Sequence, residues 1–433
     1  MAFNRIHFYS LPRPINGCGA CRFEVFGKRH FKAEKKDNPA VPRIIPNNHI
    51  TLFQNGEAYF PAIEAALDRA MHEIYLESYI FEDDTTGRRM AEALRRAALR
   101  GVKTHVLIDG FGSFRLPKTM VDDLEAAGVM VLKFRPKTSP WTLRRRRLRR
   151  LHRKIVVVDR KIAFVGGINI IDDMDMPGQT SPRYDFAVSV EGPLVGEIHA
   201  STRRVWSRVA WTRLRPGRGW DNDRYMPSIS TEPAGLMQAA FLVRNNIRHR
   251  RDIENAYLQA IEQARFEIIL ASAYFLPGLN FRHALLDATG RGVRVVLLLQ
   301  GRMDHPLLHY ASHALYDSFL DTGIEIYQYH KSMMHAKVAV IDEHWATVGS
   351  SNLDPFSLLL ALEANVVVDD ENFAKKLKHS LEQAIKMGAR RILQNHWRTQ
   401  PIRLRLASWL SYGLVRFMVG MTGYAPGKES GQI

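Results

Sequence analysis

Hydrophobic and polar positions follow the same order twice along the chain. Each half begins with an apolar helical stretch, a short strand and a longer helix that runs into the tripeptide Arg-Gly-Val. These segments are residues 62–67, 73–78 and 87–100 in the first half, and 257–261, 267–272 and 281–291 in the second. Glycine directly after a helix favours the positive φ of the C′ position, so Gly101 and Gly292 mark matching helix ends.

A strand, a helix and a further strand follow in each half. The predicted segments are residues 104–108, 121–127 and 129–134 in the first half, and 295–299, 311–320 and 324–329 in the second. Such alternation of strands and helices is typical of sheets that are covered by helices. The sequence therefore predicts an α/β fold of two homologous repeats, each a mixed sheet flanked by helices.

Each half continues with one chemical motif, His-x-Lys followed after four residues by Asp. The two copies are His152, Lys154 and Asp159, and His335, Lys337 and Asp342. β-Branched and apolar runs on both sides of the Asp predict a buried hairpin, at 155–158 with 162–165 and at 338–341 with 346–348. Side chains of a strand alternate between its faces, so the histidine and lysine of each copy share one face.

The residue types of the motif suit a phosphate diester. One imidazole can attack the phosphorus, a second can protonate the leaving group, and two ammonium groups can hold the anionic oxygens. Each hairpin runs into a small-residue turn that ends in Asn169 or Asn352, whose amide groups can donate to the same oxygens. Because each half supplies only one histidine and one lysine, we expect the active site at a pseudo-twofold interface between the halves.

Carboxylates downstream of the motifs complete the predicted site. Asp185 and Glu363 each open an apolar strand and can orient an imidazole through its second nitrogen. Asp159 and Asp342 fall at hairpin turns, where aspartate commonly makes local hydrogen bonds. Two roles stay open for this second pair, a direct one in the chemistry and a structural one in the hairpin.

Composition limits the partners and the cofactors. The 433 residues suit two or three domains, and the net charge of +17 favours nucleic acid, an anionic membrane or a phosphorylated substrate. The chain has two cysteines, Cys18 and Cys21, so no disulfide framework is expected. We expect no metal or other cofactor, because the lysines supply the positive charge that a magnesium ion would provide. Neither a signal peptide nor a spanning helix is predicted.

Four segments are predicted along the chain: an N-terminal extension at 1–40, repeats at 41–225 and 226–390, and an amphipathic membrane-associated tail at 391–433. Aromatic and basic residues mark two stretches as contacts to an anionic membrane. These candidates are Trp141, Arg144, Arg145, Arg146 and Arg147 before the first motif, and Trp409 and Phe417 in the tail. Alternatively, the stretch before the first motif is a solvated basic loop, and the tail is a helix packed on the protein.

The paired motifs resemble those of the phospholipase D superfamily, over roughly residues 48–385. Within it, the segments 55–60, 81–84, 152–167 and 344–354 are most similar to the bacterial cardiolipin synthases of type B. The resemblance implies transfer of a phosphatidyl group between two phosphatidylglycerol molecules, with His152 as nucleophile and His335 as acid and base. It also implies a peripheral protein on the cytoplasmic side of the cell membrane, without a nucleic-acid partner.

The sequence leaves three other functions open. A phospholipase D would use water as the acceptor, and the motifs do not separate a hydrolase from a transferase. A phosphodiesterase or nuclease would suit the positive charge equally well, but it would not need the apolar, aromatic tail. A binding protein with an inactive site is disfavoured because all six motif residues are intact.

Overall fold

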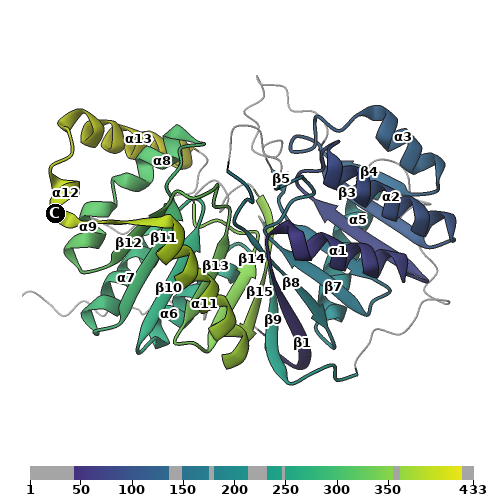
Figure 1. The fold of residues 1–433 in the computed structure, drawn as a ribbon, viewed down its shortest axis with the longest axis horizontal. Helices are drawn as coiled ribbons and strands as arrows, with labels where there is room; N and C mark the ends of the chain where they lie inside the picture. Colours follow the sequence, from purple (N-terminus) through teal and green to yellow (C-terminus); the bar gives the residue numbers. More distant parts are fainter. Residues whose placement is uncertain are drawn as a thin grey trace, which may run out of the picture. The chain divides into compact units, whose positions relative to one another are not determined.

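The computed structural model in Figure 1 describes residues 43–135, 149–174, 180–212, 232–245, 249–354 and 361–421. Within these ranges the chain forms a mixed sheet with helices on its faces, so the predicted α/β class is confirmed. Neighbouring strands follow the order β16-β12-β11-β10-β13-β14-β15-β9-β1-β8-β7-β6-β2-β3-β4, and β5 pairs with β15.

The first half alternates strands and helices before it reaches the motif hairpin. Its elements are β1 (Ile45–Gln54), α1 (Asn55–Asp68), β2 (Glu73–Ser78), α2 (Thr85–Leu99), β3 (Lys103–Asp109), α3 (Lys118–Ala126), β4 (Met130–Phe134), β5 (Arg150–Leu151), β6 (Lys154–Val158), β7 (Ile162–Gly166), β8 (Phe186–Glu191) and α5 (Val195–Thr212). Asp84 begins α2 with a side chain that accepts a hydrogen bond from the Gly87 backbone N–H at 2.7 Å, a standard N-terminal cap.

The second half repeats this order and adds C-terminal helices. Its elements are β9 (Met237–Arg244), α6 (Asp252–Gln263), β10 (Glu267–Ser272), α7 (Leu279–Gly290), β11 (Arg294–Gln300), α8 (Pro306–His313), α9 (Tyr316–Asp321), β12 (Glu325–Tyr329), β13 (Lys337–Ile341), β14 (Trp345–Gly349), β15 (Ala361–Asp369), α11 (Glu371–Gly388), β16 (Ala389–Ile392), α12 (Gln394–Arg398) and α13 (Ile402–Met421). The single helix predicted at 311–320 is two short helices, α8 and α9, in the structure.

The pairing of strands is the same in both halves. Strands β2, β3 and β4 run parallel, and the hairpin β6–β7 joins the free side of β2 in antiparallel orientation. Strands β10, β11 and β12 and the hairpin β13–β14 repeat this arrangement. The antiparallel pair β1–β9 connects the two halves within one sheet. The start of each motif strand thereby lies beside the carboxyl end of the first parallel strand of its half.

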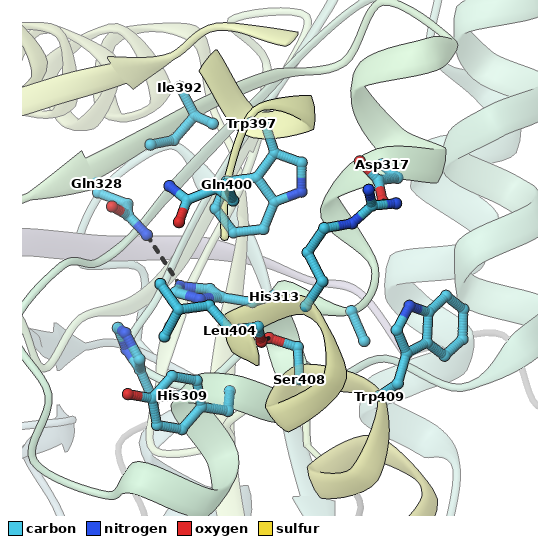
Figure 2. Close-up of a pocket in the computed structure, with 13 residues that line it drawn as sticks. His309, His313, Asp317, Gln328, Ile392, Trp397, Gln400, Leu404, Ser408 and Trp409 are labelled. Carbon is cyan, nitrogen blue, oxygen red and sulfur yellow. Dashed lines mark hydrogen bonds and ion pairs between the residues drawn. The ribbon is translucent and has the colours of Figure 1, made fainter. Parts of the chain in front are cut away.

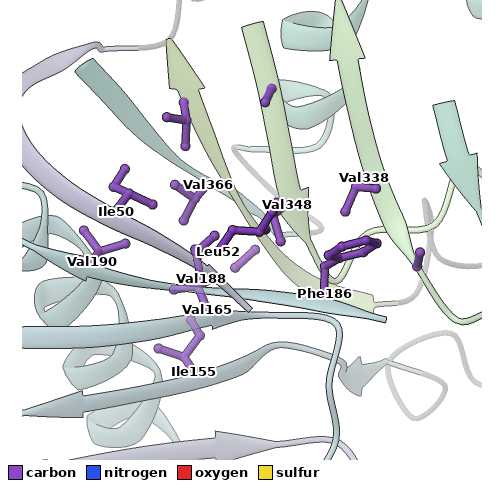
Figure 3. Packing of buried hydrophobic residues seen from close by; sticks show 14 of the residues in the cluster. Ile50, Leu52, Ile155, Val165, Phe186, Val188, Val190, Val338, Val348 and Val366 are labelled. Carbon is purple, nitrogen blue, oxygen red and sulfur yellow. The ribbon is translucent and has the colours of Figure 1, made fainter. Parts of the chain in front are cut away.

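Side chains from both halves share one hydrophobic core (Figure 3). Val165 and Val188 of the first half and Val348 and Val366 of the second belong to the same buried cluster, and β7 and β8 contact β14. Two further clusters fill the outer faces, one beneath α1, α2 and α3 and one beneath α6, α7, α8 and α9. The motif strands are buried on both faces, which explains why their sequences are continuous apolar runs.

The segment boundaries stay a prediction. Those at 40/41 and 225/226 lie outside the described residues. Near the third, at 390/391, strand β16 runs from Ala389 to Ile392 and pairs with β12. The sheet therefore continues two residues into the segment that the sequence assigns to the tail.

Candidate active site

The backbone at each motif histidine is hydrogen-bonded to a segment of the opposite half. The short strand β5 pairs in parallel with β15, and the backbone N–H of His152 donates to the Leu362 carbonyl at 3.0 Å. In the other direction, the backbone N–H of His335 donates to the Tyr184 carbonyl at 2.8 Å. These backbone bonds place each motif at the junction between the halves.

Each imidazole is hydrogen-bonded to a carboxylate from the opposite half. Nδ1 of His152 lies 3.0 Å from both carboxylate oxygens of Glu363, and Nδ1 of His335 lies 2.6 Å from Oδ2 of Asp185. In the sequence, each carboxylate follows the histidine of its own half, but the structure exchanges the partners. Because each carboxylate engages Nδ1, Nε2 is the imidazole nitrogen available for a substrate. Both carboxylates are buried.

The two lysines are buried next to these pairs. The ammonium group of Lys154 donates to the backbone carbonyl of His152 at 2.8 Å, and that of Lys337 donates to the carbonyl of His335. Burial lowers the pKa of Lys154 to about 7 and that of Lys337 to about 8. The charge of Glu363 opposes this shift at both lysines, so the two halves form one electrostatic site.

Burial also shifts the pKa values of the imidazoles and of their carboxylates. It lowers the pKa of both His152 and His335, and the nearby lysines add to the effect. Burial raises the pKa of Asp185 to about 6. At Glu363 the same burial is outweighed by His152, Lys154 and other partners, and the net pKa is lowered. The two halves are therefore similar in geometry and different in charge distribution.

The hairpin aspartates lie at the other end of their strands from the histidines. The carboxylate of Asp159 accepts hydrogen bonds at 2.8 to 2.9 Å from the backbone N–H groups of residues 71, 72 and 73. That of Asp342 accepts equivalent bonds at 2.7 to 2.8 Å from residues 265, 266 and 267. Their direct catalytic role, one of the two that the sequence leaves open, is not supported by this geometry. Both carboxylates fix the hairpin to the neighbouring strand.

The small-residue turns lie directly against the two carboxylates. A Cβ at Gly167 would lie 2.3 Å from Oδ1 of Asp185, so the carboxylate needs glycine here. At the matching position Ser350 donates its hydroxyl to Glu363 at 2.5 Å. Asn169 accepts a hydrogen bond from the Ile80 backbone N–H at 3.2 Å, which directs its NH2 group away from Ile80.

Asn352 lies buried at the corresponding place of the second half. The position of both amides is consistent with their predicted role as phosphate donors, which stays a prediction.

Sequence reasoning missed Tyr79, which directly follows β2. Its ring centre lies 4.8 Å from that of His152, and the ammonium nitrogen of Lys154 lies 5.4 Å from the same ring. Burial raises the pKa of the Tyr79 hydroxyl to about 12. The matching position of the second half is Ala273, so this aromatic wall exists on one side of the site. Only that difference between the repeats could have signalled the residue.

The predicted membrane contacts divide into two groups. Trp141 and Arg144, Arg145, Arg146 and Arg147 lie outside the described residues. In α13, the side chains of Trp409 and Phe417 are 56% and 63% exposed. Along the described part of the chain, no helix combines the length and the hydropathy that a membrane span needs.

The opposite side of α13 packs on the protein (Figure 2). Ser408 and Val415 of α13 are buried, and the helix contacts α8. A pocket of about 260 Å³ lies between the tail and α8, lined by His309, His313, Trp397 and Trp409 among others. None of its lining residues belongs to the two motifs. The tail helix therefore has one face on the second repeat and an apolar face in solvent.

Known proteins with the same features were found by sequence and by structure. A family model described as "Cardiolipin synthase, PLD-like domain" matches residues 63–178 and 257–385. The chain is 37% identical over 389 residues to cardiolipin synthase B of Escherichia coli strain K12, covering 88% of this chain and 90% of that protein. Cardiolipin synthase A of Pseudomonas putida is 31% identical over 385 residues, covering 86% and 77%.

A solved structure, phosphatidylserine synthase from Haemophilus influenzae Rd KW20, shares the fold with a TM-score of 0.64 at 13% identity. The structural match covers 86% of this chain and 94% of the phosphatidylserine synthase chain. The paired motifs, the shared architecture and the extent of the sequence match lead to one conclusion: the chain belongs to the cardiolipin synthase family of phospholipase D-like proteins.

Proposed function

We propose that the protein is a phosphatidyltransferase that joins two phosphatidylglycerol molecules into cardiolipin and releases glycerol. The observation that carries this proposal is the exchanged pairing of the two histidines with Glu363 and Asp185, with two buried lysines beside them. The names of the relatives, cardiolipin synthases A and B, support phosphatidyl transfer as the reaction class.

In the first step, Nε2 of His152 attacks the phosphorus of the donor lipid. A nitrogen–phosphorus bond forms, the bond to the headgroup glycerol breaks, and His335 gives its proton to the departing oxygen. Lys154 and Lys337 neutralise the non-bridging oxygens as their charge increases. Because the pKa of Glu363 is lowered, this residue stays an anion and stabilises the positive charge that develops on the phosphatidyl-histidine ring.

In the second step, a terminal hydroxyl of a second phosphatidylglycerol replaces the histidine. His335 takes the proton of that hydroxyl, the new phosphorus–oxygen bond forms, and the bond to His152 breaks. Asp185 supports this proton exchange, because burial raises its pKa to about 6 and the Asp185–His335 pair can hold a proton near neutral pH. Glycerol and cardiolipin are the products, and both histidines return to their initial state.

The same proposal places the protein on the cytoplasmic surface of the cell membrane. Its substrates are lipids, and the exposed apolar side chains of α13 offer a surface that fits the interfacial region of a bilayer. The net charge of +17 favours anionic lipids as the partner. Co-sedimentation with anionic vesicles measures this contact directly.

Product analysis tests the reaction. Purified full-length protein is incubated with phosphatidylglycerol vesicles, and lipids and glycerol are quantified by mass spectrometry. Equal amounts of cardiolipin and glycerol are expected, and His152→Ala and His335→Ala should each abolish both products. His283→Ala replaces an exposed histidine outside the motifs and serves as the matched control. A rapid quench in alkaline denaturant, followed by digestion, should yield a phosphatidyl adduct on the peptide that contains His152.

Other outcomes would overturn the assignment in distinct ways. Phosphatidic acid with no cardiolipin would make the protein a hydrolase that uses water as the acceptor. Cleavage of DNA without any lipid product would make it a nuclease. An adduct on the peptide of His335 would leave transfer intact and exchange the roles of the two histidines.

A further inference from the structure

The turn that links β3 to α3 presents two phenylalanine rings to solvent. Phe111 is 52% exposed and Phe114 is 70% exposed, although Ser113 between them and Leu116 after them are buried. Exposed phenylalanines within one short turn are unusual on a surface that faces only water. The mechanism of the two motifs makes no use of these rings.

Hydrogen bonds connect this turn to Asp109 and to Tyr79, the neighbour of His152. Asp109 accepts a bond from the backbone N–H of Gly112 at 3.0 Å, and the Ser113 hydroxyl donates to the Tyr79 carbonyl at 3.0 Å. A Cβ at Gly112 would lie 2.3 Å from the same Tyr79 carbonyl oxygen, so the turn is in close contact with the tyrosine. Because the Tyr79 ring packs on His152, the exposed rings lie at the rim of the predicted active site.

Arginines surround the two rings. The guanidinium carbon of Arg150 lies 4.9 Å from the centre of the Phe111 ring, and that of Arg115 lies 5.5 Å from the Phe114 ring. Arg135 and Arg150 each keep a buried Nη1 atom without a hydrogen-bond partner among the described residues. Burial and two neighbouring arginines lower the pKa of Arg135, which indicates positive charge that the protein does not neutralise.

In the described part of the second repeat, the turn after β11 carries no phenylalanine. Arg302 occupies the position of Phe111, two residues after the end of β11, and its guanidinium group is used internally. It donates to the backbone carbonyls of His330 at 2.9 Å and Lys331 at 3.2 Å, and to the Thr180 hydroxyl at 3.1 Å. Among the residues that the structure describes, the turn after β3 therefore differs from its counterpart after β11 in both its exposed rings and its arginines.

We propose that this surface, Phe111 and Phe114 with Arg115, Arg135 and Arg150, docks on an anionic lipid bilayer at the rim of the active site. The rings enter the interfacial region, and the positive charge of the guanidinium groups attracts the phosphates of anionic lipids. Charge complementarity selects an anionic bilayer as the occupant. The docking brings a lipid headgroup to the side of His152, and it rests on the proposed function only for the choice of phosphatidylglycerol.

Vesicle binding of the full-length protein tests the proposal. The vesicles are phosphatidylcholine alone, or phosphatidylcholine with phosphatidylglycerol in a two-to-one ratio. The double variant Phe111→Ser/Phe114→Ser should lower partitioning to the mixed vesicles by about tenfold or more, since two aromatic groups no longer leave water. Its thermal midpoint should be unchanged because both rings are exposed. Phe266→Ser removes a ring that is 74% exposed next to the Asp342 hairpin and is the matched control.

A second variant and a second substrate separate this inference from the function. Arg115→Gln/Arg135→Gln should remove the preference for phosphatidylglycerol vesicles. Turnover of a short-chain phosphatidylglycerol, dispersed as monomers, should stay at the wild-type level in the phenylalanine variant. Wild-type vesicle binding by that variant would overturn the docking surface, even if cardiolipin is made. Loss of a dimer with unchanged vesicle binding would assign the rings to a second copy of the chain. Lost binding in a protein without any lipid product would refute the proposed function and keep the docking surface.

Discussion

The buried ammonium group of Lys154 predicts how stability depends on pH. Burial lowers the pKa of Lys154 from its usual 10.5 to about 7. Between these two values the unfolded chain binds more protons than the folded protein, so stability rises with pH in this window. The whole difference corresponds to about 4 to 5 kcal/mol at about 1.4 kcal/mol for each pKa unit.

The variant Lys154→Met isolates this contribution. Between about pH 7 and about pH 9, the wild type should gain about 2 kcal/mol in unfolding free energy relative to the variant. Urea unfolding followed by tryptophan fluorescence at several pH values gives both curves. Lys161→Met, an exposed lysine in the turn of the same hairpin, is the control and should keep the wild-type pH dependence.

Activity should change in the opposite direction over the same window. Deprotonation of Lys154 and Lys337 removes positive charge from the predicted phosphate site, so kcat/KM should fall as the pH rises through about 7 to 8. A constant difference in unfolding free energy between wild type and Lys154→Met across this window would refute the reasoning. Such a result would mean that the ammonium group is hydrated in the folded protein.

Two further predictions concern a buried ion pair and the tail. Arg153 and Glu77 are both 3% exposed and joined by hydrogen bonds of 2.6 and 2.7 Å, so Arg153→Ala should cost about 3 to 5 kcal/mol, measured by urea unfolding. Adding Glu77→Ala should recover much of this lost unfolding free energy, because it removes the buried charge that Arg153→Ala leaves unpaired. The second repeat has Ala336 and Ala271 at the matching positions. A double variant that loses twice as much unfolding free energy as Arg153→Ala would contradict this explanation. Trp409→Ser/Phe417→Ser should reduce co-sedimentation with phosphatidylglycerol vesicles, and equal binding would show that the exposed face of α13 serves another purpose.

The repeated fold could be predicted because the same short-range sequence patterns occur in both halves. Strands β2 and β10 occur at the predicted residues 73–78 and 267–272, and the motif hairpins lie where the apolar runs indicate. Two copies of each pattern separate a signal from chance. The helix predicted at 311–320 was wrong in detail, since α8 ends at His313 and α9 begins at Tyr316.

The exchange of carboxylates could not be predicted from spacing along the chain. It depends on the two-residue strand β5, which pairs with β15 and carries His152 to Glu363 of the other half. Such pairing is decided by how the two halves pack, and a two-residue strand has no periodicity to recognise. The different residues at Gly167 and Ser350 follow from the same packing. Gly167 leaves room for the Asp185 carboxylate, and Ser350 donates a hydrogen bond to Glu363.

The sequence by itself determined the residue types of the site and the number of repeats that carry them. Covalent spacing places His and Lys on one side of a strand in any fold that contains the hairpin. Only the tertiary structure decided which carboxylate meets which imidazole and how far burial lowers the pKa of the two lysines. It also decided that the turn containing Gly112 and Ser113 lies against Tyr79. These properties depend on distances between segments up to 211 residues apart, and distances of that kind are fixed by packing.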